Sequence, residues 1–316
     1  ALDAVTSSGQ NVAVGYAALT NNTAASNTAV GYYALKDNVD THSCTAVGRA
    51  AAENATANYT TALGDRAMAG ATVTGEQNTA VGHYALYANT SGELNTAVGS
   101  GALDANTTGD NNVAFGHNAL SANTTAGDGT ALGKSALASN TTGNYNTAVG
   151  YRSSKSNTTG YSNSSLGYYS LDTNTTGNEN TALGSRSLQS NTTGHGNVAI
   201  GRDALRLNTT PSDNVAVGRD ALTLNTTGEA NVAIGSWALD ANETGSNNVA
   251  IGKSALDNNT TGGTNTGCGR ESLKANTTGS SNTALGYQAL LASTTGSDNT
   301  ALGTLTLKTN TSGHSN

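Results

Sequence analysis

The histidines are the first residues to test for catalysis or metal binding. The 316-residue chain has five, and they fall at only two positions of a repeated sequence unit. His83 and His117 share one position. His42, His195 and His314 share the other, so whole units separate them and they cannot form a metal cluster or a Cys/His dyad. With no nucleophile elbow and no phosphate-binding loop containing a lysine, the sequence predicts no enzyme, no metal site and no cofactor.

The two cysteines are the next reactive residues. Cys44 lies in the third unit and Cys268 in the sixteenth. Coils stacked at ~4.8 Å would hold them too far apart for a disulfide within one chain. Cys268 takes an aliphatic position expected in the core. Cys44 takes a position that is usually Asn, where it could meet its copies in an oligomer.

The repeat that places these residues reads Asn-Thr-Ala-Val-Gly-x-x-Ala-Leu-x-x-Asn-Thr-Thr-Gly-x-x. The fifth position is Gly in every unit, and the sixth, seventh, tenth and eleventh vary freely. Fixed positions beside free ones indicate a solenoid, whose coils contact only their neighbours. The eighteen units begin at Asn11, Asn27, Cys44, Thr60, Asn78, Asn95, Asn112, Gly129, Asn146, Asn163, Asn180, Asn197, Asn214, Asn231, Asn248, Asn265, Asn282 and Asn299.

Each unit is too short for a helical hairpin and is rich in poor helix formers. The second to fourth positions predict a short strand, which the Gly ends by adopting positive φ. The Ala-Leu pair predicts a second short strand, and Asn-Thr-Thr-Gly a strand end or turn. The fold class is therefore all-β, a β-solenoid or β-roll of about 18 short coils. Residues 1–10 are expected to form a leading segment that enters the first coil. Residues 11–316 are expected to form one continuous repeat array without clear caps, either a segment of a longer fibre or a unit continued by other domains.

The alternation within the strand predicts its two faces. The aliphatic fourth and ninth positions would supply the core. The nearly constant Ala at the third position would then point the other way and pack against another chain. We expect an intimate homotrimer around a threefold axis; a single-chain coil with two packed faces is the alternative.

The Asn at the first position predicts a stacked amide ladder. The Asn at the twelfth position often heads an Asn-x-Thr triplet, which is a glycan acceptor in a secreted eukaryotic protein or simply part of a polar turn and ladder. These possible glycan sites are Asn106, Asn123, Asn140, Asn157, Asn174, Asn191, Asn225, Asn259 and Asn276.

Composition excludes several partners. The net charge is −7, and the 14 Lys and Arg are scattered without forming a basic stripe, so nucleic acid is not an expected partner. No apolar run is long enough to span a membrane. Exposed aromatic residues are typical contact residues. At the free sixth and seventh positions they are Tyr16, Tyr32, Tyr33, Tyr84, Tyr151, Tyr168, Tyr169, Trp237 and Tyr287, and they equally suit a surface filler or a contact with a neighbouring chain.

The unit resembles repeats of bacteriophage tail-fibre and bacterial surface-fibre proteins. Its core, as in Asn197 to Gly201 and Asn231 to Gly235, is similar to the head repeats of YadA-like trimeric autotransporter adhesins. The resemblance implies a trimeric fibre outside the cell, on a cell surface or virion, with an adhesive or host-contact role. Its partners would be copies of itself and a cell-surface glycan or protein receptor. The alternative function is ice binding by a β-solenoid that uses stacked Asn and Thr rows.

Overall fold

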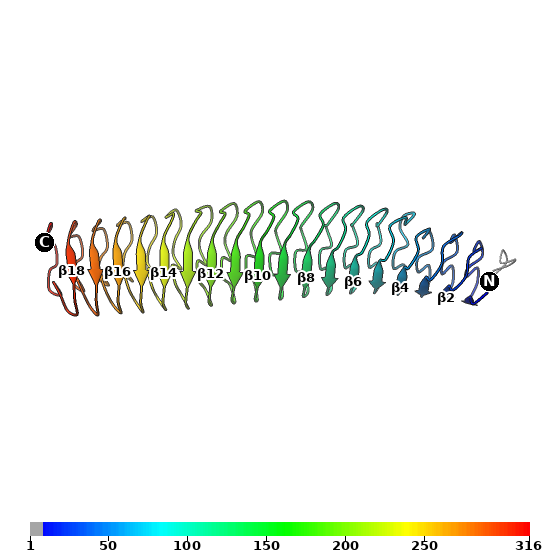
Figure 1. The fold of residues 1–316 in the computed structure, drawn as a ribbon, viewed down its shortest axis with the longest axis horizontal. Helices are drawn as coiled ribbons and strands as arrows, with labels where there is room; N and C mark the ends of the chain where they lie inside the picture. The colour runs from blue at the N-terminus through cyan, green and yellow to red at the C-terminus, as the bar shows by residue number, and fades with distance from the viewer. Residues whose placement is uncertain (1–8) are drawn as a thin grey trace. The chain divides into compact units, whose positions relative to one another are not determined.

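The computed structural model describes residues 9–316, so most of the leading segment expected over residues 1–10 lies outside the described residues. The chain divides into two compact units, residues 1–160 and residues 161–316. The described residues form strands, turns and bends but no helix. Among them there is accordingly no helix long and apolar enough to cross a membrane. The fold is an all-β parallel β-solenoid with one three-residue strand per repeat (Figure 1).

The first unit holds β1 (Val12–Val14), β2 (Thr28–Val30), β3 (Thr45–Val47), β4 (Thr61–Leu63), β5 (Thr79–Val81), β6 (Thr96–Val98), β7 (Val113–Phe115), β8 (Thr130–Leu132) and β9 (Thr147–Val149). The second holds β10 (Ser164–Leu166), β11 (Thr181–Leu183), β12 (Val198–Ile200), β13 (Val215–Val217), β14 (Val232–Ile234), β15 (Val249–Ile251), β16 (Thr266–Cys268), β17 (Thr283–Leu285) and β18 (Thr300–Leu302). The predicted strand at the second to fourth positions is therefore confirmed in every repeat.

Within each unit, consecutive strands pair in parallel and in register. In the first unit Thr79 lies opposite Thr96, and in the second Val232 lies opposite Val249. Each strand position thus meets the same repeat position of the next coil. A residue and its counterpart 17 residues later become neighbours at about the 4.8 Å spacing of paired strands.

The core of each coil is built from small side chains, and the predicted assignment of the strand faces is wrong. The third-position Ala side chains are fully buried inside their own chain from Ala29 to Ala301. They pack with the Ala-Leu pair, such as Ala102 and Leu103, which is also fully buried. Such a narrow interior admits only small side chains at the third position, Ala in most coils with Ser165 and Gly267 as exceptions, because a large side chain would overpack it. The aliphatic fourth position, expected in the core, lies on the outer face instead.

The Ala-Leu segment is a turn, and the second strand predicted there is absent from every described coil. Its leucines adopt left-handed φ, as in Leu86 (φ 50°) and Leu103 (φ 52°). This conformation turns the chain sharply enough to close a short coil while the side chain still points inward. The Leu86 amide then donates to the Ala102 carbonyl of the next coil at 3.0 Å, so the turn continues the ladder between coils.

The fifth-position glycines have positive φ, as predicted. At Gly218 (φ 139°) a Cβ would lie 2.6 Å from the carbonyl of Gly235 in the next coil. Both the backbone conformation and the close approach of neighbouring coils therefore require Gly at this position.

The predicted Asn ladder is confirmed, and a second one runs beside it. The Asn78 side-chain oxygen accepts from the Asn95 amide N–H at 2.9 Å. At the twelfth position, Asn106 Nδ2 donates to Asn89 Oδ1 at 2.9 Å and to the Gly109 carbonyl at 3.0 Å. All of these Asn side chains are buried. The ladders satisfy backbone and amide groups in an interior that water does not reach.

Candidate functional site: an apolar face and a basic ridge

The outer face of the strands in each unit is uncharged, with an aliphatic row beside a row that is mostly Thr in the first unit and mostly Thr or Val in the second. Its second position carries Thr, Val or Ser and its fourth carries Val, Leu, Ile, Phe or Cys, with no charged residue at either position. We call this surface the apolar face. Phe115 is 58% exposed and Leu166 52%. The other large fourth-position side chains that count as exposed are Val14, Val47, Leu132, Leu183, Ile200, Ile234, Ile251, Leu285 and Leu302.

The size of the apolar face distinguishes it from scattered surface hydrophobics. A three-residue strand at 4.8 Å spacing offers about 50 Å² per coil. Nine coils give on the order of 400 Å² in each unit, which is as large as the largest apolar patch on a typical monomer. Apolar patches of this size are often functional, so the strip is a candidate contact surface.

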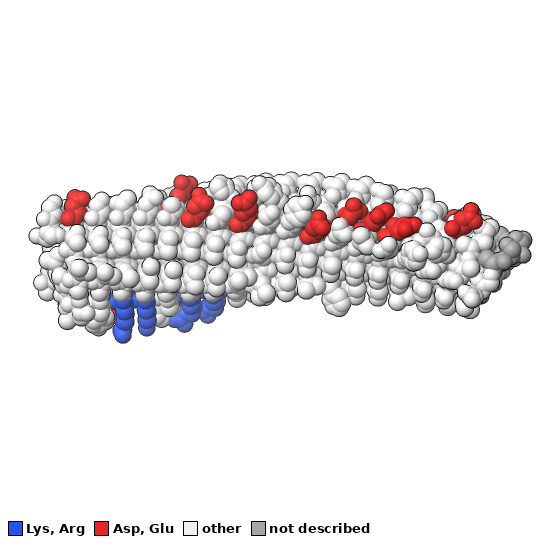
Figure 2. Space-filling view, viewed as in Figure 1, with Lys and Arg blue, Asp and Glu red and all other residues white. Residues whose placement is uncertain are grey.

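Basic side chains at the sixth or seventh position form a second feature. The first unit has four of them in two adjacent pairs of coils, Arg49 with Arg66 and Lys134 with Arg152, and the second unit has a longer row. Arg186, Arg202, Arg219, Lys253 and Arg270 occupy the sixth or seventh position, next to the glycine that follows the strand. Figure 2 shows Lys and Arg side chains gathered along one edge of the coils of β12 to β16, with Asp and Glu side chains on the opposite edge. We call these five residues the basic ridge.

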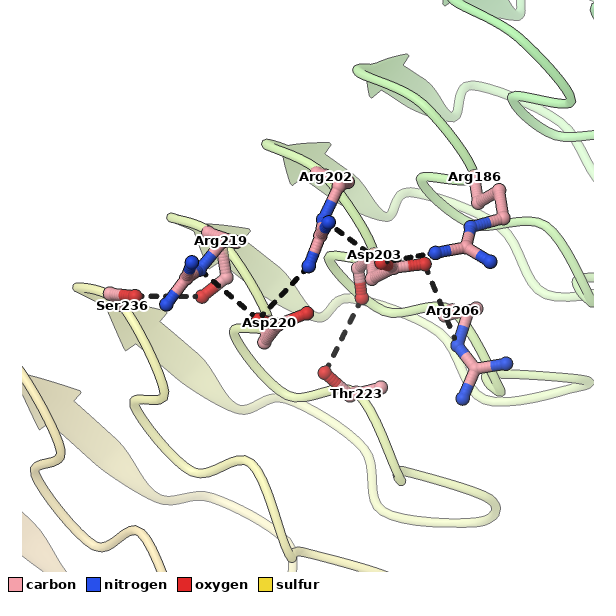
Figure 3. Close-up of polar contacts among 8 residues, drawn as sticks. All are labelled: Arg186, Arg202, Asp203, Arg206, Arg219, Asp220, Thr223 and Ser236. Atoms are coloured by element: carbon pink, nitrogen blue, oxygen red, sulfur yellow. Dashed lines mark hydrogen bonds and ion pairs between the residues drawn. The ribbon is translucent and has the colours of Figure 1, made fainter.

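Carboxylates hold the ridge in place (Figure 3). The Asp203 side chain is only 6% exposed and is paired with Arg186 Nη2 at 2.8 Å and Arg202 Nε at 3.3 Å. Arg206 Nε approaches its other oxygen at 3.7 Å. In the next coil Asp220 pairs with Arg219 at 3.2 Å. Because each carboxylate contacts more than one side chain or coil, the guanidinium groups are oriented before any ligand arrives.

Further along the ridge, an aromatic ring separates two cations. Arg219 Cζ lies 4.3 Å from the centroid of the Trp237 ring, and Lys253 Nζ lies 5.1 Å from it. Trp237 belongs to the coil between those of Arg219 and Lys253. Such cation–π contacts reduce the freedom of long basic side chains. The ridge therefore continues across the one coil that contributes no cation.

At the end of the ridge, Arg270 pairs with Glu271 at 3.1 Å. Gln288 Nε2 donates to the other oxygen of Glu271 at 2.7 Å. That hydrogen bond, together with the Arg270 guanidinium, holds the pKa of Glu271 below its usual value. Glu271 is therefore ionised at neutral pH and, like Asp203 and Asp220, presents an acceptor between donors.

The predicted aromatic contact residues all lie along the sixth and seventh positions, but they gather in separate groups. Tyr16, Tyr32 and Tyr33 are close together, with the Tyr32 and Tyr33 ring centroids 4.0 Å apart. Tyr84 packs edge-on against the neighbouring His83 at 4.2 Å. Others are Tyr151, Tyr168, Tyr169 and Tyr287; the ring centroids of Tyr168 and Tyr169 are 4.3 Å apart, and Arg270 lies 5.9 Å from the Tyr287 ring.

The structure places the possible glycan sites in the interior. The nine Asn side chains of the Asn-x-Thr triplets are at most 1% exposed. In Asn225, for example, Nδ2 donates to Asn208 Oδ1 at 2.9 Å and to the Gly228 carbonyl at 2.8 Å. A glycan on this nitrogen would break the ladder. The same burial removes the Asn row from any ice-binding face: Asn106 points inward, whereas Thr108 is exposed.

Both cysteines lie where they were not expected. Cys268, expected in the core, is on the outer face, and Cys44, which could have met its copies in an oligomer, is inside its own chain. Cys44 is buried, and its thiol donates to the Ala57 carbonyl at 3.2 Å inside its own chain. Burial raises the pKa of this thiol. Cys268 stands on the partly exposed fourth position of β16, on the apolar face. Both are free thiols.

The histidines remain apart, as their spacing predicted. His83 Nε2 approaches Asp65 at 3.5 Å on the surface. His195 lines an open surface depression with Tyr161, Asn178 and Glu179. Across residues 9–316, no three His, Cys, Asp or Glu side chains are grouped to hold a metal ion.

The chain matches no known family model and no curated protein.

The basic ridge is the feature that sequence reasoning missed, and the expectation that the cations form no stripe is wrong for the second unit. Its signal is the repeated Gly-Arg-Asp-Ala-Leu at Gly201 to Leu205 and Gly218 to Leu222. Cations that look scattered along the sequence share the sixth or seventh repeat position. A 17-residue coil reduces that separation to one strand spacing.

Proposed function

We propose that the protein is a structural segment of an extracellular fibre, on a cell surface or virion, in which three copies pack through their apolar faces. The observation that carries this proposal is the exposed aliphatic row at the fourth position of the strands. Water would otherwise cover it along every coil. An adhesive or host-contact role, toward a glycan or protein receptor, follows from the resemblance to fibre and adhesin repeats.

Copies of the same chain are the best partner because their periods are identical. Each coil of one copy can present the same rows to the equivalent coil of another, so one favourable contact is repeated along the face. Two units of on the order of 400 Å² each give on the order of 800 Å² per chain. In a trimer this area is divided between two neighbours, and the contact is repeated at three interfaces. The absence of charge at both outward positions means that no buried ion has to be paired.

The proposal of three chains rests on the resemblance to the head repeats of trimeric adhesins and on the two-row shape of the apolar face. The second and fourth positions form two parallel rows on each chain. Around a threefold axis one row meets the neighbour on one side and the second row meets the other neighbour. Trimeric fibre heads with a similar Asn-x-Ala-Ile-Gly core favour this arrangement over a face-to-face pair.

Light scattering after gel filtration tests the assembly. The proposal predicts a mass of three chains. Ile234→Asp with Ile251→Asp places charges on the apolar face and should shift the mass to one chain. Thr227→Asp with Thr244→Asp adds the same charge at exposed fourteenth positions and should leave three chains. A folded single chain, or a stable pair, in the unmodified protein would overturn the trimer.

Cys268 offers an independent test of the face itself. If three apolar faces meet in register, copies of Cys268 from β16 come together near the axis. In a Cys44→Ser background, mild oxidation should cross-link two chains of each trimer. Cys268→Ser should abolish the product. Thr278→Cys, exposed at the fourteenth position, should not replace it. Trimers that resist cross-linking at Cys268 yet form one at Thr278→Cys would show that another face is the interface.

A further inference from the structure

We propose that the basic ridge of the second unit binds a linear acidic polysaccharide that lies along the stacked coils. This names a ligand class for the adhesive role and rests on that proposed function for its setting. The ridge consists of Arg186, Arg202, Arg219, Lys253 and Arg270, all at the sixth or seventh position of their coils. Three of these cations are about half exposed or more: Arg202 at 56%, Arg219 at 49% and Arg270 at 59%.

The spacing of the ridge suits a polymer. Successive coils repeat at about 4.8 Å, which is close to the advance of one sugar residue in an extended chain. Arg202 and Arg219 stand in adjacent coils, and so do Lys253 and Arg270. A polysaccharide with a carboxylate or sulfate on each sugar, or on alternate sugars, can therefore meet one cation after another without bending.

The carboxylates between the cations favour a sugar polymer over a nucleic acid. Asp220 and Glu271, which are 20% and 17% exposed, leave negative oxygens beside the guanidinium groups. Sugar hydroxyls need acceptors as well as donors, and these oxygens supply them. A DNA backbone has no free hydroxyl groups along the strand, so it offers the interleaved carboxylates no donors and only charge repulsion. The mixed row thus matches a ligand that carries both hydroxyl groups and separate anionic groups.

The ridge is also held rigid before binding. Asp203, nearly buried, fixes Arg186, Arg202 and Arg206 from three coil positions. Trp237 fixes the directions of Arg219 and Lys253. Ordering long basic side chains is a large part of the entropic cost of binding, and here much of that cost is already met within the fold. Basic side chains on a freely solvated surface are not usually held by several partners in this way, so the arrangement favours a binding role.

The rest of the second unit confines the polymer to this edge. Acidic side chains lie on the opposite edge of the coils (Figure 2). The apolar face beside the ridge has no charge or amide to bind hydroxyl groups. An anionic polymer is therefore attracted to one line of the surface and repelled from another, which orients it along the coils.

Binding is tested with the full chain and defined polymers. Polygalacturonate supplies one carboxylate per sugar, dextran sulfate supplies sulfate groups, and unmodified dextran is the neutral control. Single-stranded DNA of similar charge tests the nucleic-acid alternative. Calorimetry or fluorescence anisotropy should show binding of at least one acidic polysaccharide, weakening as salt rises because exposed charges are screened. Dextran should not bind, and DNA should bind more weakly.

The ridge variant is Arg202→Gln, Arg219→Gln and Lys253→Gln. Loss of three exposed charge contacts should weaken polysaccharide binding by about tenfold or more. The matched control, Lys36→Gln, Lys155→Gln and Lys308→Gln, removes the same charge from the tenth position, outside the ridge, and should bind like the unmodified chain. Arg202→Lys with Arg219→Lys should retain most of the affinity. Thermal unfolding of each variant separates lost binding from lost folding.

The outcomes overturn the inference cleanly. Equal weakening in the ridge and control variants would reduce the effect to net charge, and tighter binding of DNA would replace the sugar polymer by a nucleic acid. No binding of either acidic polysaccharide by a folded trimer would contradict this inference and leave the fibre proposal standing. A monomer that binds through the ridge would contradict the trimer alone.

Discussion

At the scale of the residue, the fifth-position glycines are required for two separate reasons, their positive φ and the close approach of the next coil. Gly286 has φ 137°, and a Cβ there would lie 2.5 Å from the Gly303 carbonyl. Gly303 has φ 121°, but its Cβ would meet only the Thr306 hydroxyl at 3.0 Å. The pair therefore separates backbone strain from the clash between coils, which cannot be distinguished at the other glycines.

Replacement of each glycine by Ala should give unequal losses. We expect Gly303→Ala to cost about 1–3 kcal/mol of unfolding free energy, from the unfavourable φ alone. Gly286→Ala should cost more than about 3 kcal/mol, because its carbonyl contact can be relieved only by separating two coils. Chemical denaturation of both variants measures the difference. Equal losses would mean that the coils separate easily.

The half-buried Asp240 makes a prediction about pH. Burial raises its pKa, helped by repulsion from Asp257 and Asp220 and opposed by a hydrogen bond with Thr223. The folded chain thus binds this proton more tightly than the unfolded chain, so stability falls as pH rises through the folded pKa. The cost is fully present at neutral pH and is absent below the ordinary Asp pKa of ~3.9.

Asp240→Asn should therefore stabilise the protein at neutral pH, by less than about 1 kcal/mol because the carboxyl is only partly buried. The gain should vanish at about pH 3.5, below the ordinary pKa of ~3.9. Asp65→Asn is the opposite control, since Arg49 lowers the pKa of Asp65; it should destabilise at neutral pH. Thermal unfolding at both pH values checks the signs, and a neutral-pH loss from Asp240→Asn would contradict the argument.

At the scale of the element, the sequence predicted the position of the three-residue strand correctly, but not which of its two faces points into the coil. The change from Thr-Ala-Val to Gly marks its end in every coil. Hydrophobicity alone suggested that the larger Val or Ile lies inside and Ala outside. The coil reverses this because its interior is already filled by Leu and two Asn rows, which leave room only for a small side chain such as Ala or Ser. The volume available inside the coil therefore determines which face of the strand points inward. That volume is known only once the path of the whole coil is known.

The twelfth-position ladder is the element that replaces a large apolar core. Asn225 Nδ2 donates to Asn208 Oδ1, and Asn225 Oδ1 accepts from Asn242 Nδ2 at 2.9 Å. Asn225→Ala should cost about 2–5 kcal/mol, because it leaves two neighbouring amides and the Gly228 carbonyl short of partners in the interior. Thr227→Ala, exposed two residues on, should cost within about 0.5 kcal/mol. Similar losses in the two variants, measured by chemical denaturation, would deny the ladder its structural role.

The basic ridge could have been predicted only by reading the sequence across coils. Along the chain, Arg202 and Arg219 are separated by a complete unit, and acidic residues intervene. In the fold they are neighbours on one edge. By contrast, the pairing of Asp203 with Arg186 and Arg206 depends on side-chain directions at left-handed positions, which no repeat pattern specifies.

At the scale of the whole molecule, contacts are strictly local in sequence. Backbone bonds join each coil to the next, as from Leu205 N to Ala221 O and from Leu273 N to Ala289 O, at 3.1 and 3.0 Å. Stability in such an array is approximately a sum of coil and neighbour terms. A defect in one coil should therefore be felt by the coils beside it and fade with distance, unlike a cavity in a globular core.

Hydrogen exchange on Asn225→Ala tests this locality. Amides of Leu205 and Leu222, in the coils of β12 and β13, should exchange faster than in the unmodified chain, by a factor that reflects the lost ladder. Amides of Leu273 and Leu290, in the coils of β16 and β17, should exchange nearly unchanged, because several intact interfaces separate them from the defect. Thr227→Ala should leave all four amides unchanged. Equal acceleration at all four amides would instead show that the unit opens as a single cooperative body, and coils could then not be treated as separable contributions to its stability.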